Sequence, residues 1–162
     1  MIEIRLLAAE HRPALEALLS EINEYYYASP RSSAASAAIA SDLLEGGYSD
    51  TALAWHGDDA IGLAIYTFLQ PTESVGSTLF LKELFVSERA RNLRIGRQLM
   101  AYLTATAQAR GCSRLDWTAQ RGNAGTMRFY ESLGAEELPQ KAYFRVRDDE
   151  MDAFLARCQA HD

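Results

Sequence analysis

The strongest constraint on the fold is an apolar segment that runs into a basic turn and then into a helical pattern. Residues 79–86, Leu-Phe-Leu-Lys-Glu-Leu-Phe-Val, are typical of a central strand, and Gly96 opens a stretch with helical apolar spacing that ends at Gly111. Four of the sixteen basic residues lie in or beside the turn: Arg89, Arg91, Arg94 and Arg97. Because a helix start offers unpaired N–H groups and a positive dipole end, this segment predicts a site for a pyrophosphate. A solvated helix start is the alternative.

A second segment, residues 123–134, reads Asn-Ala-Gly-Thr-Met-Arg-Phe-Tyr-Glu-Ser-Leu-Gly and predicts a helix with a tyrosine near its C-terminal end. Asn123 suits the N-cap position of this helix. An isolated tyrosine at helical spacing is usually a core residue, so any catalytic role for Tyr130 depends on the surrounding pattern.

Length and composition favour a single domain over residues 1–162. The chain has 162 residues and 48% apolar content, which is enough for one core. A net charge of -6 argues against a nucleic-acid partner. Neither a membrane span nor a signal peptide is indicated, so we expect a cytoplasmic protein without a membrane partner. Cys112 and Cys158 have no metal-ligand spacing, and we expect both to be small core residues and no metal site.

Periodicity and turn residues predict eleven elements in the order β-α-α-β-β-β-α-β-α-β-α. The strands are expected at residues 2–7, 51–56, 60–68, 78–86, 114–119 and 142–146. The helices are expected at residues 13–26, 33–45, 96–111, 123–134 and 151–158. Pro13 suits a first helical turn, and Gly57 marks a hairpin.

The two segments together resemble the acyl-CoA-binding and acid-donor segments of the GCN5-related N-acetyltransferases (GNAT), and the resemblance extends from about Thr51 to Val146. It implies an α/β (α+β) fold with a central, mixed, mostly antiparallel sheet flanked by helices. It also implies transfer of an acetyl group from acetyl-CoA (coenzyme A) to a primary amine. Within the family, the local likeness is nearest to the diamine and thialysine N-acetyltransferases.

The resemblance assigns acetyl-CoA to three parts of the chain. The matching positions are Leu84, Phe85 and Val86 on the strand, Arg91, Asn92, Leu93, Arg94, Ile95, Gly96 and Arg97 in the turn and helix start, and Asn123 with Tyr130. Arg94 stands at the family's first glycine. If this position requires a positive φ, an arginine there costs about 1 kcal/mol or more. If it is helical, the guanidinium is free to reach a phosphate, and this is our expectation.

The resemblance also places the catalytic groups. Tyr130 matches the residue that donates a proton to the departing sulfur, and Glu83 is the candidate base, acting directly or through water. His56 is a reserve base. Because Cys112 has no histidine near it in the sequence, we expect direct attack by the bound amine rather than a covalent acetyl-enzyme.

The acceptor pocket of this family is built from the first two helices and the loops between strands. The candidate residues are Glu24, Tyr26, Tyr27, Lys82 and Glu83, with Glu73 in a turn. Aromatic rings and carboxylates suit an organic ammonium, although Tyr26 is alternatively a core residue. The diamine enzymes carry Glu and Asp where this chain has Lys82 and Glu83, which weakens the case for a polyamine. The two side chains face opposite sides unless a bulge intervenes.

These observations predict an N-acetyltransferase acting on a small-molecule amine, whether polyamine-like, an amino acid or a related compound. One alternative is a non-catalytic acyl-CoA-binding regulatory module. Another is an enzyme that acetylates protein lysines or N-termini. A homodimer formed through the C-terminal strand and helix is a further expectation.

Overall fold

The computed structural model describes residues 1–28, 32–70, 75–91 and 93–160. The chain forms two compact units, Met1–Gly122 and Asn123–Asp162. The first unit contains β1 (Ile2–Leu6), α1 (Arg12–Tyr27), α2 (Ser33–Glu45), β2 (Asp50–His56), β3 (Asp59–Leu69), β4 (Thr78–Val86), α3 (Ile95–Ala109) and β5 (Arg114–Trp117), with short 3-10 helices at Ala9–His11 and Glu88–Ala90. The second unit contains α4 (Ala124–Glu131), a 3-10 helix at Asp148–Glu150, and α5 (Met151–Gln159).

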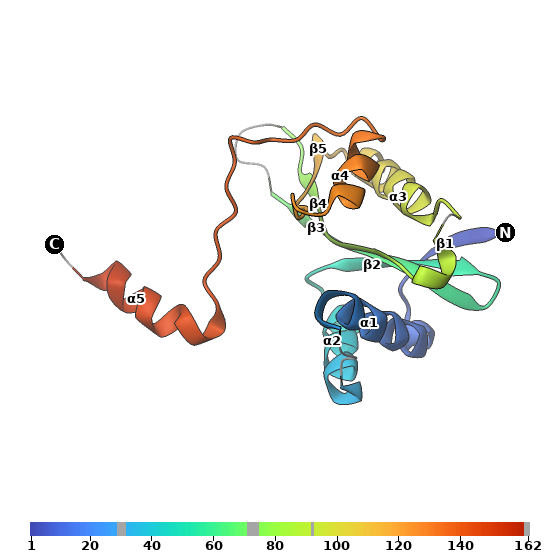
Figure 1. The fold of residues 1–162 in the computed structure, drawn as a ribbon, viewed down its shortest axis with the longest axis horizontal. Coiled ribbons are helices and arrows are strands. Elements are labelled where there is room, and N and C mark those ends of the chain that lie inside the picture. Colours follow the sequence, from blue (N-terminus) through green and yellow to red (C-terminus); the bar gives the residue numbers. More distant parts are fainter. Residues whose placement is uncertain (29–31, 71–74, 92, 161–162) are drawn as a thin grey trace. The chain divides into compact units, whose positions relative to one another are not determined.

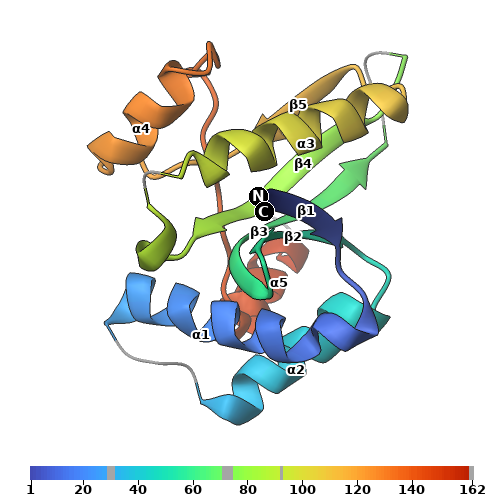
Figure 2. The ribbon, with the colours of Figure 1, turned by 90° about the vertical axis from the view of Figure 1, so that its right-hand side faces the viewer.

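The first unit is built on a five-stranded sheet in the order β1-β2-β3-β4-β5. The first three pairings are antiparallel, and β4 pairs with β5 in parallel. Helices α1 and α2 cover one face of the sheet, and α3 covers the other (Figures 1 and 2). The predicted mixed, mostly antiparallel sheet flanked by helices is therefore confirmed.

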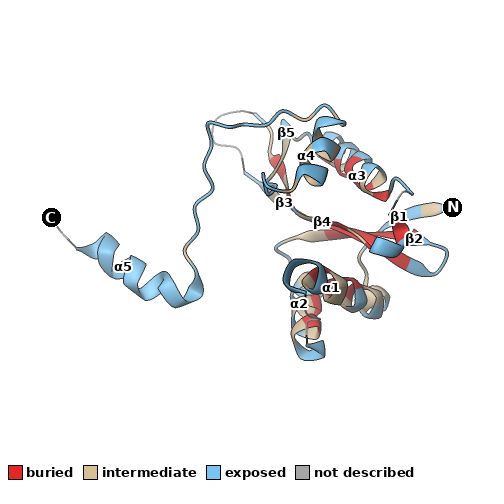
Figure 3. Ribbon diagram, viewed as in Figure 1, coloured by how far each residue is buried: buried red, intermediate tan, exposed pale blue. Residues whose placement is uncertain are grey.

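Buried residues lie along the strands of the sheet and on the helices that cover its two faces (Figure 3). On one face, the inward stripe of α1 packs with the sheet in a cluster that includes Leu15, Leu18, Leu19, Ile22, Leu53, Leu63 and Phe85. On α3, Ile95, Leu99 and Leu103 recur at helical spacing and are almost fully buried. Each buried leucine or isoleucine contributes about 1.5 to 3 kcal/mol, so these two stripes hold α1 and α3 in place.

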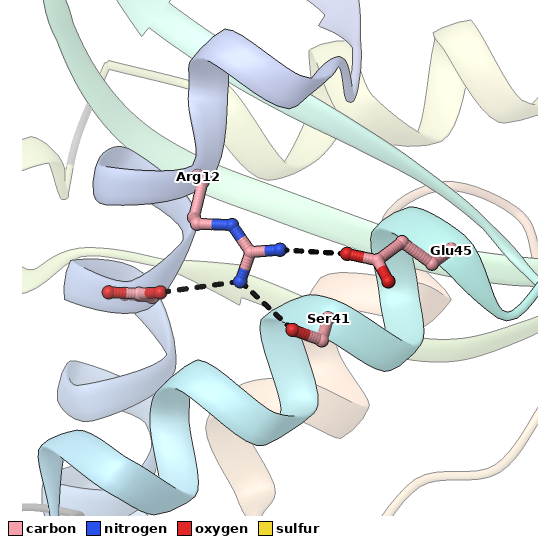
Figure 4. Close-up of polar contacts among 4 residues, drawn as sticks. Arg12, Ser41 and Glu45 are labelled. Atoms are coloured by element: carbon pink, nitrogen blue, oxygen red, sulfur yellow. Dashed lines mark hydrogen bonds and ion pairs between the residues drawn. The ribbon is translucent and has the colours of Figure 1, made fainter.

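The beginning of α1 is tied to α2 through one arginine (Figure 4). Arg12 donates hydrogen bonds to Ser41 Oγ and Glu45 Oε1, both at 3.1 Å, and lies 3.7 Å from Glu16. Exposed ion pairs contribute little to stability. The contacts therefore orient the two helices, while apolar packing supplies most of the free energy.

The second unit differs from the sequence prediction at its C-terminal end. Residues 142–146 form no strand, because no described strand supplies the ladder of hydrogen bonds that an extended segment needs. Helix α5 is present, but Met151, Phe154 and Leu155 are 57%, 47% and 55% exposed. Cys158 is also exposed, so its assignment to the core was wrong.

Cys112 in the first unit is half-buried, and its sulfur lies 3.3 Å from Ser77 Oγ. Among the described helices, none is both long enough and apolar enough to cross a lipid bilayer.

Candidate active site

The sheet opens between β4 and β5. Their parallel pairing joins Thr78–Leu81 to Arg114–Trp117 and stops there, whereas β4 continues to Val86 beside β3. The Ser87 N–H donates to the Ile61 carbonyl at 2.9 Å, so Ser87 turns its backbone toward the β3 side. Because backbone groups alternate along a strand, the N–H and C=O groups of Leu84 and Val86 point the other way, to the open edge. The sequence prediction placed the acyl carrier at these residues.

A β-bulge in β4 decides which way the candidate base faces. The register passes from Ile65 opposite Glu83 to Tyr66 opposite Leu81, which leaves Lys82 without an opposite residue. Residues paired across strands share a face of the sheet. Ile65 packs against the α1 cluster, whereas Tyr66 hydrogen-bonds to Tyr102 of α3. The extra residue therefore turns Glu83 to the α1 face, while Leu81 stays on the α3 face.

On the α1 face, Glu83 meets a tyrosine from the end of α1. The Tyr26 hydroxyl donates a hydrogen bond to Glu83 Oε1 at 3.1 Å. Burial raises the pKa of Glu83 above its ordinary value, and the hydrogen bond from Tyr26 and the charge of Lys82 oppose this effect. A carboxyl group with a raised pKa is a better proton acceptor near neutral pH than an exposed one.

The end of α1 presents a cluster of aromatic rings. Tyr26 is 47% exposed, so the alternative assignment of this residue to the core was wrong. The Tyr25 ring meets Tyr26 and Phe85 edge-on, at centroid distances of 5.2 and 6.3 Å. Tyr27 lies 6.4 Å from Tyr26, and Glu24 is exposed on the same turn. Sequence reasoning missed the contacts of Tyr25 and the bond between Tyr26 and Glu83.

The turn that precedes α3 contains a strained residue. Arg94, the N-cap of α3, has φ 56° and ψ 26°, so the expectation that this position is helical was wrong. A left-handed conformation costs a non-glycine residue about 1 to 2 kcal/mol. The N–H groups of Ile95 and Gly96 have no acceptor within the helix, because the first turn precedes every possible partner. A left-handed residue ahead of a helix start gathers such N–H groups into an anion-binding concavity.

The other residues of the basic turn differ in their contacts and in their exposure to solvent. Arg89 donates to the Ala60 carbonyl at 2.9 Å and therefore anchors the turn to β3. Arg91 pairs with Glu88 at 2.7 Å, and both side chains are more than half exposed. Leu93 and Arg97 are exposed as well, whereas Asn92 lies outside the described residues.

The remaining predicted residues lie elsewhere. Asn123 is the N-cap of α4, as predicted, and its Oδ1 accepts from the Thr126 N–H at 3.1 Å. Tyr130 lies near the C-terminal end of α4, half-buried, with its ring 5.1 Å from Phe129. His56 is exposed at the end of β2, and Glu73 lies outside the described residues.

The first unit thus brings together a half-buried carboxylate, a phenol, an open strand edge and a helix start with free N–H groups. The open edge matches the amide groups of a pantetheine arm, and the helix start with its arginines matches a pyrophosphate. The residues present fit acetyl-CoA. Fold and site together define a transferase that takes an acyl group from a phosphate-bearing carrier.

Comparison with known proteins gives the same assignment. The model of the acetyltransferase (GNAT) family matches residues 15–135. The chain therefore belongs to the acetyltransferase (GNAT) family, as the sequence predicted. It is an acetyl-CoA-dependent N-acetyltransferase.

Solved structures resemble the chain over most of its length. An integron cassette protein from the mobile metagenome of V. cholerae is 30% identical, with a TM-score of 0.85 over 95% of this chain and 97% of that chain. The aminoglycoside N-acetyltransferase AAC(6')-Iy, in complex with CoA, is 20% identical, with a TM-score of 0.73 over 91% and 95%. A ribosomal-protein-alanine N-acetyltransferase from Brucella melitensis biovar Abortus 2308 is 19% identical, with a TM-score of 0.75 over 91% and 99%. The last two likenesses show the fold alone.

Proposed function

We propose that this enzyme acetylates the primary amine of a small molecule by direct attack of the amine on acetyl-CoA. The observation that carries the proposal is the half-buried Glu83 carboxylate, which Tyr26 holds beside the open edge of β4. A carboxylate in this place binds an ammonium group and takes its proton.

Acetyl-CoA supplies the activated acetyl group when it is bound. In the proposed arrangement, the backbone groups of Leu84 and Val86 hydrogen-bond the carrier and Phe85 supports them from the core. The N–H groups at the start of α3 hold the pyrophosphate, and the guanidinium groups of Arg91, Arg94 and Arg97 add positive charge. We keep Leu93 and Asn92 among the proposed cofactor-binding residues, together with Asn123, which contacts the pantetheine arm.

The proposed proton transfers use two side chains. Glu83 removes a proton from the acceptor ammonium, and the Tyr130 hydroxyl donates a proton to the departing sulfur. We propose residues 1–162 as a single catalytic domain. Cys112 stays outside the chemistry, so the amine attacks the acetyl group directly.

The acceptor we propose carries one ammonium group next to an anionic group, as an amino acid does. Glu83, Glu24 and the rings of Tyr26 and Tyr27 suit the ammonium. Lys82 is exposed at the bulge, adjacent to Glu83, and suits a carboxylate. A polyamine would bring a second positive charge toward Lys82, so despite the local likeness to the diamine enzymes we place polyamines second. AAC(6')-Iy has been solved with a bisubstrate analogue of an acetylated aminoglycoside amine, which supports a small-molecule acceptor.

A panel of amines tests the proposal. The purified enzyme is assayed for thiol release from acetyl-CoA with amino acids, diamines, an aminoglycoside and a lysine-containing peptide. We expect turnover with at least one small amine. Turnover restricted to the peptide would favour protein acetylation. Binding of CoA without turnover of any amine would contradict the proposal and favour a regulatory module.

Two properties of the protein in the cell complete the proposal. We infer a cytoplasmic location, because Cys112 and Cys158 are free thiols and a reducing compartment preserves them.

We infer a homodimer formed through the C-terminal segment, where Phe144 and Phe154 are 89% and 47% exposed. Analytical ultracentrifugation tests the dimer: Phe154→Glu should shift it toward monomer, and a wild-type protein that sediments as a monomer would contradict it.

A further inference from the structure

We infer that Tyr26 is a positioning residue that holds the carboxylate of Glu83 in place and leaves one of its oxygens for the acceptor. The inference rests on the proposed role of Glu83 as the base. It adds a second function for a residue first considered as part of the acceptor pocket, because Tyr26 acts on the reaction through Glu83.

The geometry of the bond carries this inference. The Tyr26 hydroxyl donates to Oε1 of Glu83 at 3.1 Å. A hydroxyl has one proton to donate, and here it is directed to one carboxylate oxygen. Among the described residues, Tyr26 is the hydrogen-bond donor to the Glu83 carboxylate, and we infer that Oε2 is available to an ammonium group. A carboxylate that is fixed through one oxygen presents the other in a defined direction, which is what a base needs for proton transfer.

The packing around Tyr26 limits its movement. The neighbouring Tyr25 ring lies edge-on to both Tyr26 and Phe85, two residues beyond Glu83 on β4. Helix α1 thus contacts β4 through two neighbouring side chains on the same face of the sheet: an aromatic contact at Phe85 and a hydrogen bond at Glu83. Phe85 is buried and belongs to the α1 cluster. The contact between Tyr25 and Phe85 therefore fixes the position of the end of α1 along β4, and with it the position of the Tyr26 hydroxyl relative to Glu83.

The charges around Glu83 are few among the described residues. From its own strand it faces Lys82, from α1 it faces the phenol of Tyr26 with Tyr25 behind it, and the residue opposite on β3 is the uncharged Ile65. Burial raises the pKa of Glu83, whereas the Tyr26 bond and the Lys82 charge lower it. Removing the Tyr26 hydroxyl removes one of the two groups that favour the ionised carboxylate, so Glu83 will hold its proton to a higher pH.

The test compares wild-type enzyme with Tyr26→Phe, which keeps the ring and removes the hydroxyl. The Glu83 carboxyl signal is titrated by NMR in protein labelled with ¹³C at glutamate side chains, and Glu83→Gln identifies that signal. The pH dependence of kcat/KM is measured in parallel with the best amine of the panel. Tyr48→Phe is the matched control, because Tyr48 is 88% exposed and precedes β2, outside the site.

In Tyr26→Phe we expect the Glu83 signal to titrate at a higher pH and the acid limb of kcat/KM to move in the same direction. On the acid limb of the profile the variant should be about fivefold slower than wild type, as expected for the loss of one hydrogen bond of ordinary strength, and this deficit should shrink as the pH rises above the pKa of Glu83 in both proteins. Tyr48→Phe should change neither quantity.

An unchanged titration of Glu83 in Tyr26→Phe would overturn the inference, whatever the activity. A titration that moves as expected, in an enzyme whose rate is insensitive to Glu83→Gln, would instead contradict the role of Glu83 in the proposed function. The two failures are therefore distinguishable.

Discussion

The hydroxyl of Tyr26 and the carboxylate of Glu83 join the end of α1 to the centre of β4, 57 residues later in the chain. Two features of the fold produce this contact. The apolar stripe of α1 sets the helix on the sheet, and the bulge at Lys82 turns Glu83 toward that helix. The contact couples an exposed aromatic cluster at the end of α1 to the half-buried carboxylate beside the bulge of β4.

Replacing Glu83 by glutamine should remove the base while preserving the shape of the site. We expect kcat/KM at pH 7 to fall by roughly 10²-fold or more, with CoA affinity unchanged. Steady-state kinetics and calorimetric titration with CoA measure the two quantities. Glu45→Gln on α2 is the matched control and should retain wild-type turnover, because that side chain is 72% exposed and pairs with Arg12. Equal rates in wild type and Glu83→Gln would exclude Glu83 as the base.

The same substitution should change how stability depends on pH. Burial raises the pKa of Glu83 in the folded protein, so the folded state favours the protonated form. Below the unfolded-state pKa of about 4.3, the protonated Glu83 side chain makes its full favourable contribution to the free energy of unfolding. This contribution is lost as the pH rises through the pKa of Glu83 in the folded protein. Glutamine resembles the protonated acid at every pH. Glu83→Gln should therefore gain stability over wild type between pH 4 and pH 8, measured by thermal unfolding across that range. A constant difference would contradict the direction of the shift.

Arg94→Gly should stabilise the protein. Glycine removes the cost of a positive φ, which is about 1 to 2 kcal/mol. It also increases the conformational entropy of the unfolded chain, which lowers the stability by about 0.5 to 1 kcal/mol. The net increase in the free energy of unfolding should be about 0.5 to 1 kcal/mol in urea titrations. Ala28→Gly is a second test of the same effect, because Ala28 has φ 52° at the end of α1.

Arg94→Ala separates the backbone from the guanidinium at this position. Alanine keeps the strained φ, so no stabilisation is expected. If the guanidinium binds a phosphate of CoA, the alanine and glycine variants should both bind CoA more weakly, by roughly tenfold, which is typical of losing one charged hydrogen bond. Unchanged CoA affinity in both variants would show that Arg94 matters only through its backbone.

Tyr130→Phe should lower turnover by roughly 10²-fold or more and leave CoA binding intact, because it removes only the proton donor. Tyr143→Phe is the matched control in the same unit, at a tyrosine that is 64% exposed. Stopped-flow measurement of thiol release with the best amine of the panel reads the effect directly. A wild-type rate in Tyr130→Phe would remove this residue from the mechanism.

Lys82→Glu should change the acceptor that the enzyme prefers. With a positive charge at the bulge, ornithine should be a better substrate than putrescine, a diamine with the same carbon spacing but no carboxylate. Reversing the charge should change the ratio of their kcat/KM values by about tenfold or more in favour of putrescine, as expected for a full charge reversal at partial exposure. Lys141→Glu in the second unit controls for net charge. An unchanged ratio would mean that Lys82 does not face the acceptor.

The sequence was sufficient for the elements with strong local signals. The long apolar strand β4, the stripe of α1 and the hairpin at Gly57 have strong local patterns, and the structure has these elements where the patterns predicted them. Residues 142–146 also have strand-forming residues, but a strand needs a neighbour, and the pattern within one segment does not reveal whether a neighbour exists. The exposure of Cys158 follows the same reasoning, because burial depends on what α5 packs against.

The sequence allowed the residues of the candidate site to be proposed, but not their geometry. Glu83, Tyr26 and the arginine turn were recognisable from residue type and family pattern. A bulge has no sequence signature when its extra residue is a lysine, so the facing of Glu83 required the structure. The φ of Arg94 also required it, because arginine rarely adopts positive values and the residue type indicated a helical position.

The single unmatched position at Lys82 makes the pairing register of β4 a functional parameter. Along a strand, side chains alternate, and one surplus residue reverses the parity of everything that follows. If Lys82 instead paired with Ile65 and closed the bulge, the acid would move to the α3 side and Leu84 to the side of the tyrosines, whereas deleting Lys82 would leave Glu83 opposite Ile65. In this segment, the side on which the acid lies therefore depends on Lys82 remaining unpaired, and a slip of the pairing by one position would move the acid from the exposed acceptor side to the packed α3 side.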